Sequence, residues 1–227
     1  MADFTMNPKA DPSDGYPPEG FEYIPFVPGI SLPPQGPLTD FQPAPDRAAC
    51  EALWDRYAVP AHIREHCQGV AHILEVLGAL IIKRGARLDP VMLLAGGLLH
   101  DIAKMYTVNY PGDHAQMGAA IVLRETRHYR LAQMVYHHVE WPWRADIDND
   151  AILPILMLIY ADKRVTHNKI VTLDERFTDL FARYGHTERR RLMIERSRQQ
   201  GLEIEKALSE RLEVRLDEYS FDSGRLV

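Results

Sequence analysis

Cysteine is scarce in this chain, which holds only Cys50 and Cys67 among its 227 residues. Two thiols are too few for a framework of several disulfides or for a zinc site built from four thiolates. Such sparing use of cysteine is typical of a reducing compartment. We therefore expect a cytoplasmic protein.

Long apolar runs are missing as well. The longest, residues 91–99 and 151–161, are shorter than the roughly 20 residues of a membrane-spanning helix, and the second contains Pro154. The first residues do not combine a basic start, an apolar stretch and a small-residue cleavage site, which is the pattern of a secretory signal. The sequence thus predicts no segment that crosses a membrane.

The chain has no excess of positive charge either, with 26 lysines and arginines, 32 acids and a formal net charge of −6. This balance disfavours a generally basic surface, so nucleic acid is not an expected partner. About −5 of the charge belongs to residues 1–45, which carry six acids and one lysine. The rest of the chain is therefore close to neutral.

Proline, by contrast, is abundant, and eleven of the sixteen prolines fall in residues 1–45. Because proline fixes φ and lacks a backbone N–H, this stretch predicts an extended proline-rich arm. We expect part of the arm to lie along the domain or a neighbouring subunit, with disorder as the alternative. This expectation rests on large apolar side chains that a solvated linker seldom carries, namely Phe21, Tyr23, Ile24, Phe26, Val27 and Ile30.

From Asp46 onward, apolar residues recur at helical spacing. Capping residues, prolines and glycines mark where the helices begin and end. The expected helices cover residues 46–57, 61–84, 91–105, 113–125, 130–139, 150–168, 172–184 and 187–218. This pattern predicts an all-α fold, a helical bundle of about seven or eight helices with no sheet.

The chain divides into three expected segments. Residues 1–45 form the arm, residues 46–185 form a helical metal-binding domain, and residues 186–227 form a long helix and a tail. The last helix has a stripe of leucines that packs either on the domain or on a partner subunit. A homodimer is therefore one expected assembly.

Histidine is the residue type that points to chemistry, because eight of the ten histidines lie in residues 62–138. His100 and Asp101 follow the most apolar run of the chain, and such a pair is costly to desolvate unless something compensates. A divalent metal would compensate for both, because imidazole and carboxylate are common ligands of transition metals. Isolated histidines such as His72 and His128 are interpreted as surface or core residues without a role.

Several of these residues occur in a distinctive order. His66 stands 34 residues before the His100-Asp101 doublet, and Asp162 follows about 60 residues later. His114 begins a His-x-x-x-Gly-Ala stretch, and a His-His pair occupies positions 137 and 138. This order resembles the HD superfamily of metal-dependent phosphohydrolases, in particular stand-alone members that hold two metals. The similarity covers residues 60–170, about half of the chain.

The resemblance implies a centre of two divalent transition-metal ions, which could be manganese, iron, nickel, cobalt or zinc. Carried over residue by residue, it implies that the first ion is held by His66, His100, Asp101 and Asp162. Asp101 would also bridge to a second ion, which His114 and His137 complete. Neighbouring helical residues point about 100° apart, so we expect His137 to be the ligand and His138 to line the pocket.

Such a centre has a definite chemistry. Two cations about 3.5–4 Å apart lower the pKa of a bridging water, and metal-activated hydroxide then attacks phosphorus without a protein nucleophile. The resemblance therefore implies hydrolysis of a phosphate ester or phosphoanhydride in a nucleotide or similar small phosphorylated molecule. Asp101 and Lys104 are the expected catalytic residues, although Lys104 could instead interact with the helix dipole. The expected substrate contacts are His62, Lys104, His138, Lys163 and Arg164.

Two other functions fit the same ligands: a di-iron oxygenase on an HD scaffold, and a non-catalytic module that senses a nucleotide. The His-His pair is not followed by the Gly-Tyr-Pro segment of the cyclic-di-GMP phosphodiesterase branch, so that substrate is not expected. Trp141 and Trp143 either stack on a nucleobase or anchor a loop. The arginines of residues 183–198 are interpreted as a solvated helix face.

Overall fold

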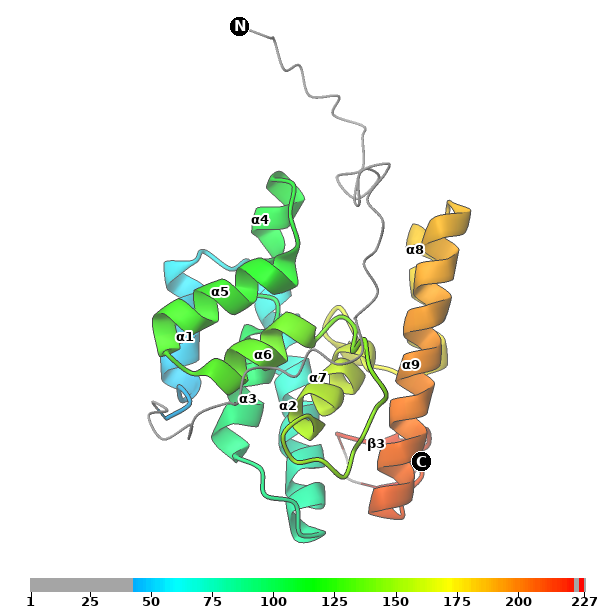
Figure 1. The fold of residues 1–227 in the computed structure, drawn as a ribbon. Coiled ribbons are helices and arrows are strands. Elements are labelled where there is room, and N and C mark those ends of the chain that lie inside the picture. Colours follow the sequence, from blue (N-terminus) through cyan, green and yellow to red (C-terminus); the bar gives the residue numbers. More distant parts are fainter. Residues whose placement is uncertain (1–42, 223–224, 227) are drawn as a thin grey trace, which may run out of the picture.

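The computed structural model describes residues 43–222 and 225–226 (Figure 1). The proline-rich arm predicted over residues 1–45 lies outside the described residues, except for its last three positions. In chain order the helices are α1 (Arg47–Arg56), α2 (Ala61–Lys83), α3 (Pro90–Leu99), α4 (Lys104–Asn109), α5 (His114–Thr126), α6 (Tyr129–His137), α7 (Leu153–Lys163), α8 (Leu173–Tyr184) and α9 (Glu188–Leu212).

Strands are short within the described part of the chain. β1 (Val165–Thr166) pairs antiparallel with β2 (Lys169–Ile170), and β3 (Tyr219–Ser220) pairs antiparallel with β4 (Arg225–Leu226). Two-residue ladders do not build a layer of the fold, so the predicted all-α bundle is confirmed. The sequence analysis did not anticipate these two small hairpins.

Aspartate side chains start three helices where the sequence predicts a start. Asp46, Asp89 and Asp113 accept hydrogen bonds of 2.7–3.1 Å from backbone N–H groups in the first turns of α1, α3 and α5. These bonds satisfy donors that a helix N-terminus otherwise leaves without a partner. The cap at Asp113 also fixes the position of His114, the first residue of α5.

Three helices end earlier than expected from the sequence, and one of them is the helix predicted over residues 187–218, which ends at Leu212. The helix predicted over residues 91–105 ends at Leu99, because i→i+3 hydrogen bonds replace the helical pattern through residues 100–103. The helix predicted to end near residue 168 ends at Lys163, where the chain turns into β1. The first break is the one that matters for function, because it places a polar turn at the tip of the most apolar helix.

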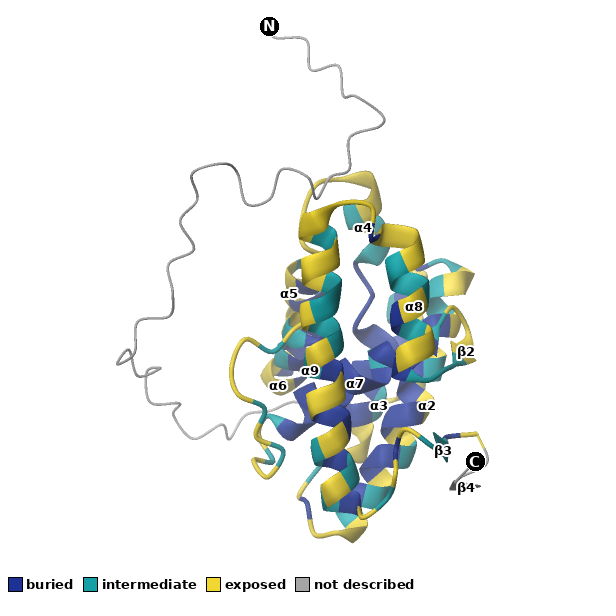
Figure 2. Ribbon diagram, turned by 90° about the vertical axis from the view of Figure 1, so that its right-hand side faces the viewer, coloured by how far each residue is buried: buried dark blue, intermediate teal, exposed yellow. Residues whose placement is uncertain are grey.

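Helix α3 packs against α1, α2, α6 and α7 (Figure 1), and Figure 2 shows buried ribbon where α2, α3 and α7 lie together. Its closest neighbour is α2, since a Cβ at Gly97 would lie only 2.4 Å from Cα of Ala71. From the other side, Trp54 of α1 donates a 2.8 Å hydrogen bond from Nε1 to the carbonyl of Leu98. Glycine at position 97 therefore lets the backbones of α2 and α3 touch.

Two helical stretches, α2 and Pro90–Asn109, are long and apolar enough to cross a membrane when judged by length and composition alone. In this fold, 44% and 61% of their most apolar windows are buried against the rest of the domain. Core helices of soluble proteins have the same composition, because a helix that is buried on most sides has little need of polar residues. Length and composition are therefore only weak evidence that either stretch spans a membrane.

The long helix α9 packs against α7 and α8 of the same chain. A buried polar network reinforces this contact, in which the Tyr160 hydroxyl donates a 2.9 Å hydrogen bond to the Glu205 carboxylate. Arg164 contacts the same hydroxyl and donates a 2.9 Å hydrogen bond to the carbonyl of Leu216, beyond the end of α9. The C-terminal helix and the segment after it are thus attached to the helical core.

Candidate metal centre

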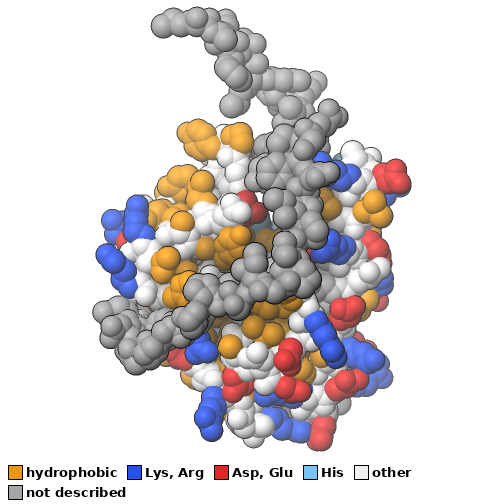
Figure 3. All heavy atoms as spheres, viewed as in Figure 1, with side chains coloured by type: hydrophobic (Ala, Val, Ile, Leu, Met, Phe, Trp, Pro, Cys, Tyr) orange, Lys and Arg blue, Asp and Glu red, His pale blue; other side chains and the backbone are white. Residues whose placement is uncertain are grey.

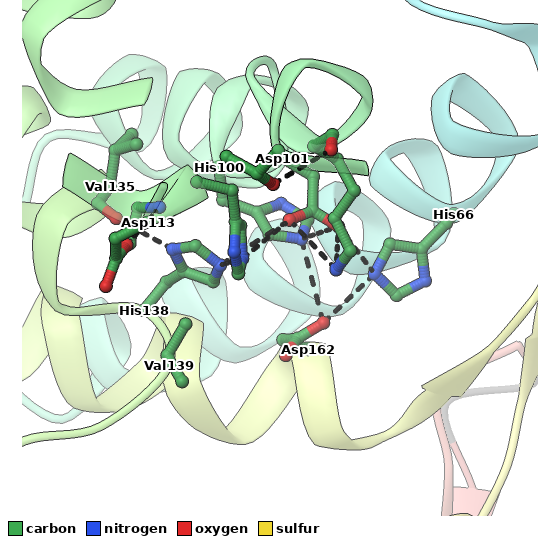
Figure 4. A network of polar contacts seen from close by, with 12 residues as sticks. His66, His100, Asp101, Asp113, Val135, His138, Val139 and Asp162 are labelled. Carbon is green, nitrogen blue, oxygen red and sulfur yellow. Dashed lines mark hydrogen bonds and ion pairs between the residues drawn. The ribbon is translucent and has the colours of Figure 1, made fainter. Parts of the chain in front are cut away.

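Segments that are far apart in the sequence meet at one point of the bundle (Figure 4). They are α2, the turn after α3, the start of α5, the end of α6, and α7. Their side chains form a histidine–aspartate cluster, which consists of His66, His100, Asp101, His114, His138 and Asp162.

One half of this cluster surrounds Oδ2 of Asp101. Nε2 of His100 lies 3.6 Å from this oxygen, and Nε2 of His66 lies 4.0 Å from it. Oδ1 of Asp162 completes this half, at 3.0 Å from His66 Nε2 and 3.6 Å from His100 Nε2. Four groups that bind divalent cations thus converge on one small volume.

The other half surrounds Oδ1 of Asp101. Nε2 of His114 lies 3.4 Å from this oxygen and Nε2 of His138 lies 3.5 Å from it, while the two nitrogens are 3.2 Å apart. In each half, three residues including Asp101 place one ligand atom apiece within 4.8 Å of the others. Asp101 therefore belongs to two groups of ligand atoms and joins them.

Backbone carbonyls orient two of the imidazoles. Nδ1 of His100 lies 2.9 Å from the carbonyl oxygen of Gly97, and Nδ1 of His138 lies 2.7 Å from that of Val135. A carbonyl oxygen only accepts, so in each neutral ring Nδ1 carries the proton and Nε2 presents its lone pair to the cluster. Among the described residues, the buried Nε2 of His100 has no hydrogen-bond partner. A buried, unpartnered lone pair beside carboxylates fits a metal ligand.

The charges of the cluster also suit a metal. Burial would raise the pKa of Asp101, but the Lys104 ammonium, His100 and His138 hold that pKa well below its usual range. Burial lowers the pKa of His114 to about 4. At neutral pH, Asp101 is therefore anionic and His114 neutral, which are the protonation states that bind a metal. Burial would lower the pKa of His100, but Cys67 and Asp101 raise it well above its usual range, so a metal would displace a proton from this ring.

Lys104 lies on the solvent side of the cluster. Its Nζ is 3.0 Å from Oδ2 and 3.3 Å from Oδ1 of Asp101. Burial would lower the pKa of Lys104, but the charges of Asp101 and Asp162 raise it. Lys104 therefore carries a positive charge beside Asp101.

The structure differs from the roles predicted for the two neighbouring histidines at the end of α6. His138 joins the cluster, whereas the ring of His137 packs against the rings of Trp141 and Trp143, with centroids 5.0 Å and 5.7 Å apart. Adjacent helical side chains point about 100° apart, so only one of the two can face Asp101. The bond from His138 to the Val135 carbonyl then fixes the orientation of the ring that does.

Three predicted substrate contacts have different surroundings. His62 is exposed on the first turn of α2, one turn before His66. Lys163 is buried and donates a 3.1 Å hydrogen bond to the carbonyl of Val139, and burial lowers its pKa to about 8. The structure does not bring Arg164 to the cluster, because its guanidinium is buried in the network that holds α9.

The sequence analysis missed the carbonyls that orient the metal-facing rings. His100 and His138 each occupy the position directly after a helix, and each bonds to the carbonyl three residues earlier. The last carbonyls of a helix have no partner within the helix, so a histidine there finds an acceptor at fixed geometry. A histidine at a helix C-terminus is the sequence signal that could have revealed this.

The bundle and its cluster define a class, that of all-α domains with a buried histidine–aspartate centre. The family model of the HD domain matches residues 63–178, just over half of the chain. The chain therefore belongs to the HD domain family, whose members bind divalent metals and are mostly metal-dependent hydrolases. No solved structure matches this chain.

Proposed function

We propose that this protein is a metal-dependent phosphohydrolase that cleaves a phosphate ester or phosphoanhydride of a small phosphorylated molecule, with a nucleotide as the expected class of substrate. The observation that carries the proposal is the position of Asp101. Its Oδ2 faces His66 and His100, and its Oδ1 faces His114 and His138. A carboxylate with ligand groups on both oxygens can bridge two ions, as hydrolysis by two metals requires.

In this proposal, each half of the cluster holds one ion. His66, His100, Asp101 and Asp162 would hold the first ion, and Asp101, His114 and His138 would hold the second. Manganese, iron, nickel, cobalt and zinc all suit a mixed set of imidazole and carboxylate ligands. The set differs from the sequence expectation only at its last member, where His138 replaces His137.

Exposure indicates how a substrate reaches the centre. The side chains of His100, Asp101 and His138 are 0%, 2% and 2% exposed, whereas those of His114 and Lys104 are 23% and 42% exposed. The approach therefore leads past the start of α4 and the start of α5. A ligand that enters there meets the Lys104 ammonium first, which favours a small anionic substrate.

Two divalent cations, when bound, lower the pKa of the water between them and neutralise phosphoryl oxygens. The chain's own residues hold the required charges in place. Asp101 stays anionic because Lys104 and the histidines lower its pKa, and the carbonyl-anchored rings of His100 and His138 cannot turn away. Lys104 stabilises negative charge that develops on the substrate. No side chain has to act as a nucleophile.

The test uses the full chain, stripped of metal by a chelator and reloaded with manganese, nickel or ferrous iron. A panel of mononucleotides, cyclic nucleotides and dinucleoside polyphosphates is then assayed with and without oxygen. We expect phosphate release that needs a metal and does not need oxygen, and we expect His66→Ala to abolish it. His72→Ala, on the exposed side of the same helix, is the matched control and should retain activity.

Three other outcomes would overturn the proposal. Turnover that requires both iron and oxygen would support the oxygenase alternative. Tight nucleotide binding without turnover for any metal would support a sensor. Activity that survives His66→Ala would place the reaction elsewhere in the protein.

A further inference from the structure

Large aromatic and apolar side chains form an exposed strip beside the metal centre. This aromatic strip consists of Tyr129 and Tyr136 on α6 and of Val139 and Trp143 in the loop that follows, and these residues are 40%, 43%, 46% and 47% exposed. The two tyrosines are seven residues apart, so they lie two turns apart on one face of α6. Hydrophobic side chains also gather on the face of the molecule that carries α4, α5 and α6 (Figure 3).

Ring packing and hydrogen bonds hold the loop that carries part of the strip. The ring of Trp141 packs against that of Trp143, with centroids 4.7 Å apart, and against that of His137. The side chain of Gln200 in α9 makes two hydrogen bonds to the backbone of Trp141. It accepts one of 3.1 Å from the Trp141 N–H and donates one of 2.7 Å to the Trp141 carbonyl. The exposed rings are therefore a surface of fixed shape, which is the kind that recognises a ligand.

Three exposed arginines flank the strip, and the exposed Glu140 between its two loop residues is paired with Arg196 at 2.7 Å. Arg127 precedes α6, Arg130 lies in its first turn and Arg144 lies in the loop, and all three are exposed. Within residues 43–222, none of these arginines forms an ion pair. An acidic, apolar segment would complement both the rings and the arginines.

The chain itself contains such a segment. Residues 16–38 hold seven prolines, four aromatic residues, two glutamates and no basic residue. Proline-rich segments bind aromatic surfaces readily, because proline has already fixed the extended backbone and little conformational entropy is lost on binding. We propose that residues 16–38 of the N-terminal arm bind to the aromatic strip of the same chain.

The link between this segment and the described part of the chain is short. Only four residues separate Leu38 from Pro43, where the described residues begin, and an extended chain covers about 3.1 Å per residue. The two tyrosines of α6 span only about 10 Å, since a helix rises about 1.5 Å per residue. Attachment in the same chain also gives the arm an effective concentration on the order of millimolar, far above that of a separate partner.

The strip adjoins the metal centre in the sequence. His138 directly precedes Val139 of the strip, and the carbonyl of Val139 accepts the hydrogen bond of Lys163. The loop part of the strip therefore begins one residue after a member of the histidine–aspartate cluster. The contact itself does not depend on the proposed hydrolase activity, so it can be tested without a substrate.

The experiment places the photo-crosslinking residue p-benzoylphenylalanine at Tyr23 or Phe26 in the full chain. After irradiation of a mixture of isotope-labelled and unlabelled protein, the linked peptides are identified by mass spectrometry. We expect cross-links within one chain to residues 129–144, reduced at least threefold by Tyr136→Ala. Tyr184→Ala is the matched control, since this tyrosine of α8 is 44% exposed, and it should leave the yield unchanged.

Several results would overturn the inference. Cross-links between labelled and unlabelled chains would show that the arm binds a second copy. Cross-links to the apolar groove between α2 and α3, which is lined by Leu74, Ile82 and Leu94, would place the arm on another surface. Absence of any cross-link to the domain, or equal effects of both tyrosine variants, would also count against it. Circular dichroism of both variants shows whether they fold.

Discussion

Nε2 of His138 lies 3.2 Å from Nε2 of His114, and both nitrogens face the same oxygen of Asp101. The carbonyl of Val135 takes the Nδ1 proton of His138, so its Nε2 points a lone pair into the cluster. Without a cation, only a proton on His114 Nε2 can bridge these two nitrogens. This relationship separates His138 from its neighbour His137 and leads to the first prediction.

Replacing His138 should remove one metal, whereas replacing His137 should not. In a metal-loaded chain, we expect His138→Ala to lower the content from about two ions per chain to about one, because the second group loses a ligand. His137→Ala should keep both ions, since its ring packs against the rings of Tyr136, Trp141 and Trp143 and not against the cluster. Metal analysis after gel filtration makes the comparison, and a larger loss in His137→Ala would refute our assignment.

Replacing Lys104 should slow the reaction without releasing metal. Lys104→Met removes the ammonium that lies 3.0 Å from Asp101 but leaves every proposed ligand in place. Loss of one electrostatic contact to the transition state typically lowers kcat by about 10²–10³. Steady-state kinetics and metal content should be measured on the same preparation. A variant with normal kcat would show that Lys104 only neutralises Asp101.

Gly97 and Gly96 should respond differently to alanine. A Cβ at Gly97 would lie 2.4 Å from the backbone of Ala71, which cannot move aside, whereas a Cβ at Gly96 would meet the flexible end of Met134. We expect Gly97→Ala to lower the free energy of unfolding by about 1–3 kcal/mol and Gly96→Ala to lower it less. The Gly97 carbonyl also orients His100, so Gly97→Ala should weaken metal binding. Denaturant titration and metal titration of both variants provide the test, and equal costs would contradict the backbone contact.

His128 should make the protein less stable in acid. Burial lowers the pKa of His128, although the charge of Asp89 opposes this effect, and its Nδ1 accepts the Leu131 N–H that caps α6. Below the usual histidine pKa of about 6.5, the unfolded chain binds a proton that the folded ring resists, so this contribution is present above that pH and disappears as the pH falls.

His128→Asn separates this effect from other titrations. Asparagine also caps helices but does not titrate in this range. The difference in unfolding free energy between wild type and variant should therefore change from pH 8 to pH 5, with wild type losing more. Denaturant titrations of the metal-free proteins at pH 8 and pH 5 measure this difference. Equal losses of unfolding free energy in wild type and variant would show that His128 is not the titrating group.

Much of the fold could be predicted from the sequence, because helix formation depends on local features. Apolar periodicity and the capping aspartates placed most helices within a few residues. The His66, His100-Asp101 and Asp162 order pointed to one cluster before any contact was known. The break after Leu99 was not predicted, because the apolar character that marks α3 does not show where its hydrogen bonds change.

The sequence by itself thus determined the class of fold and the kinds of ligand that this protein offers to a metal. Tertiary structure alone decided which side chains reach the centre. His137 and His138 have the same chemistry, and the phase of α6 against α3 and α5 turns only the second toward Asp101. Arg164 follows Asp162 by two residues, yet it points to the carbonyl of Leu216, 52 residues away. Local patterns specify helices, but a side chain's direction depends on the packing of helices that are distant in the chain.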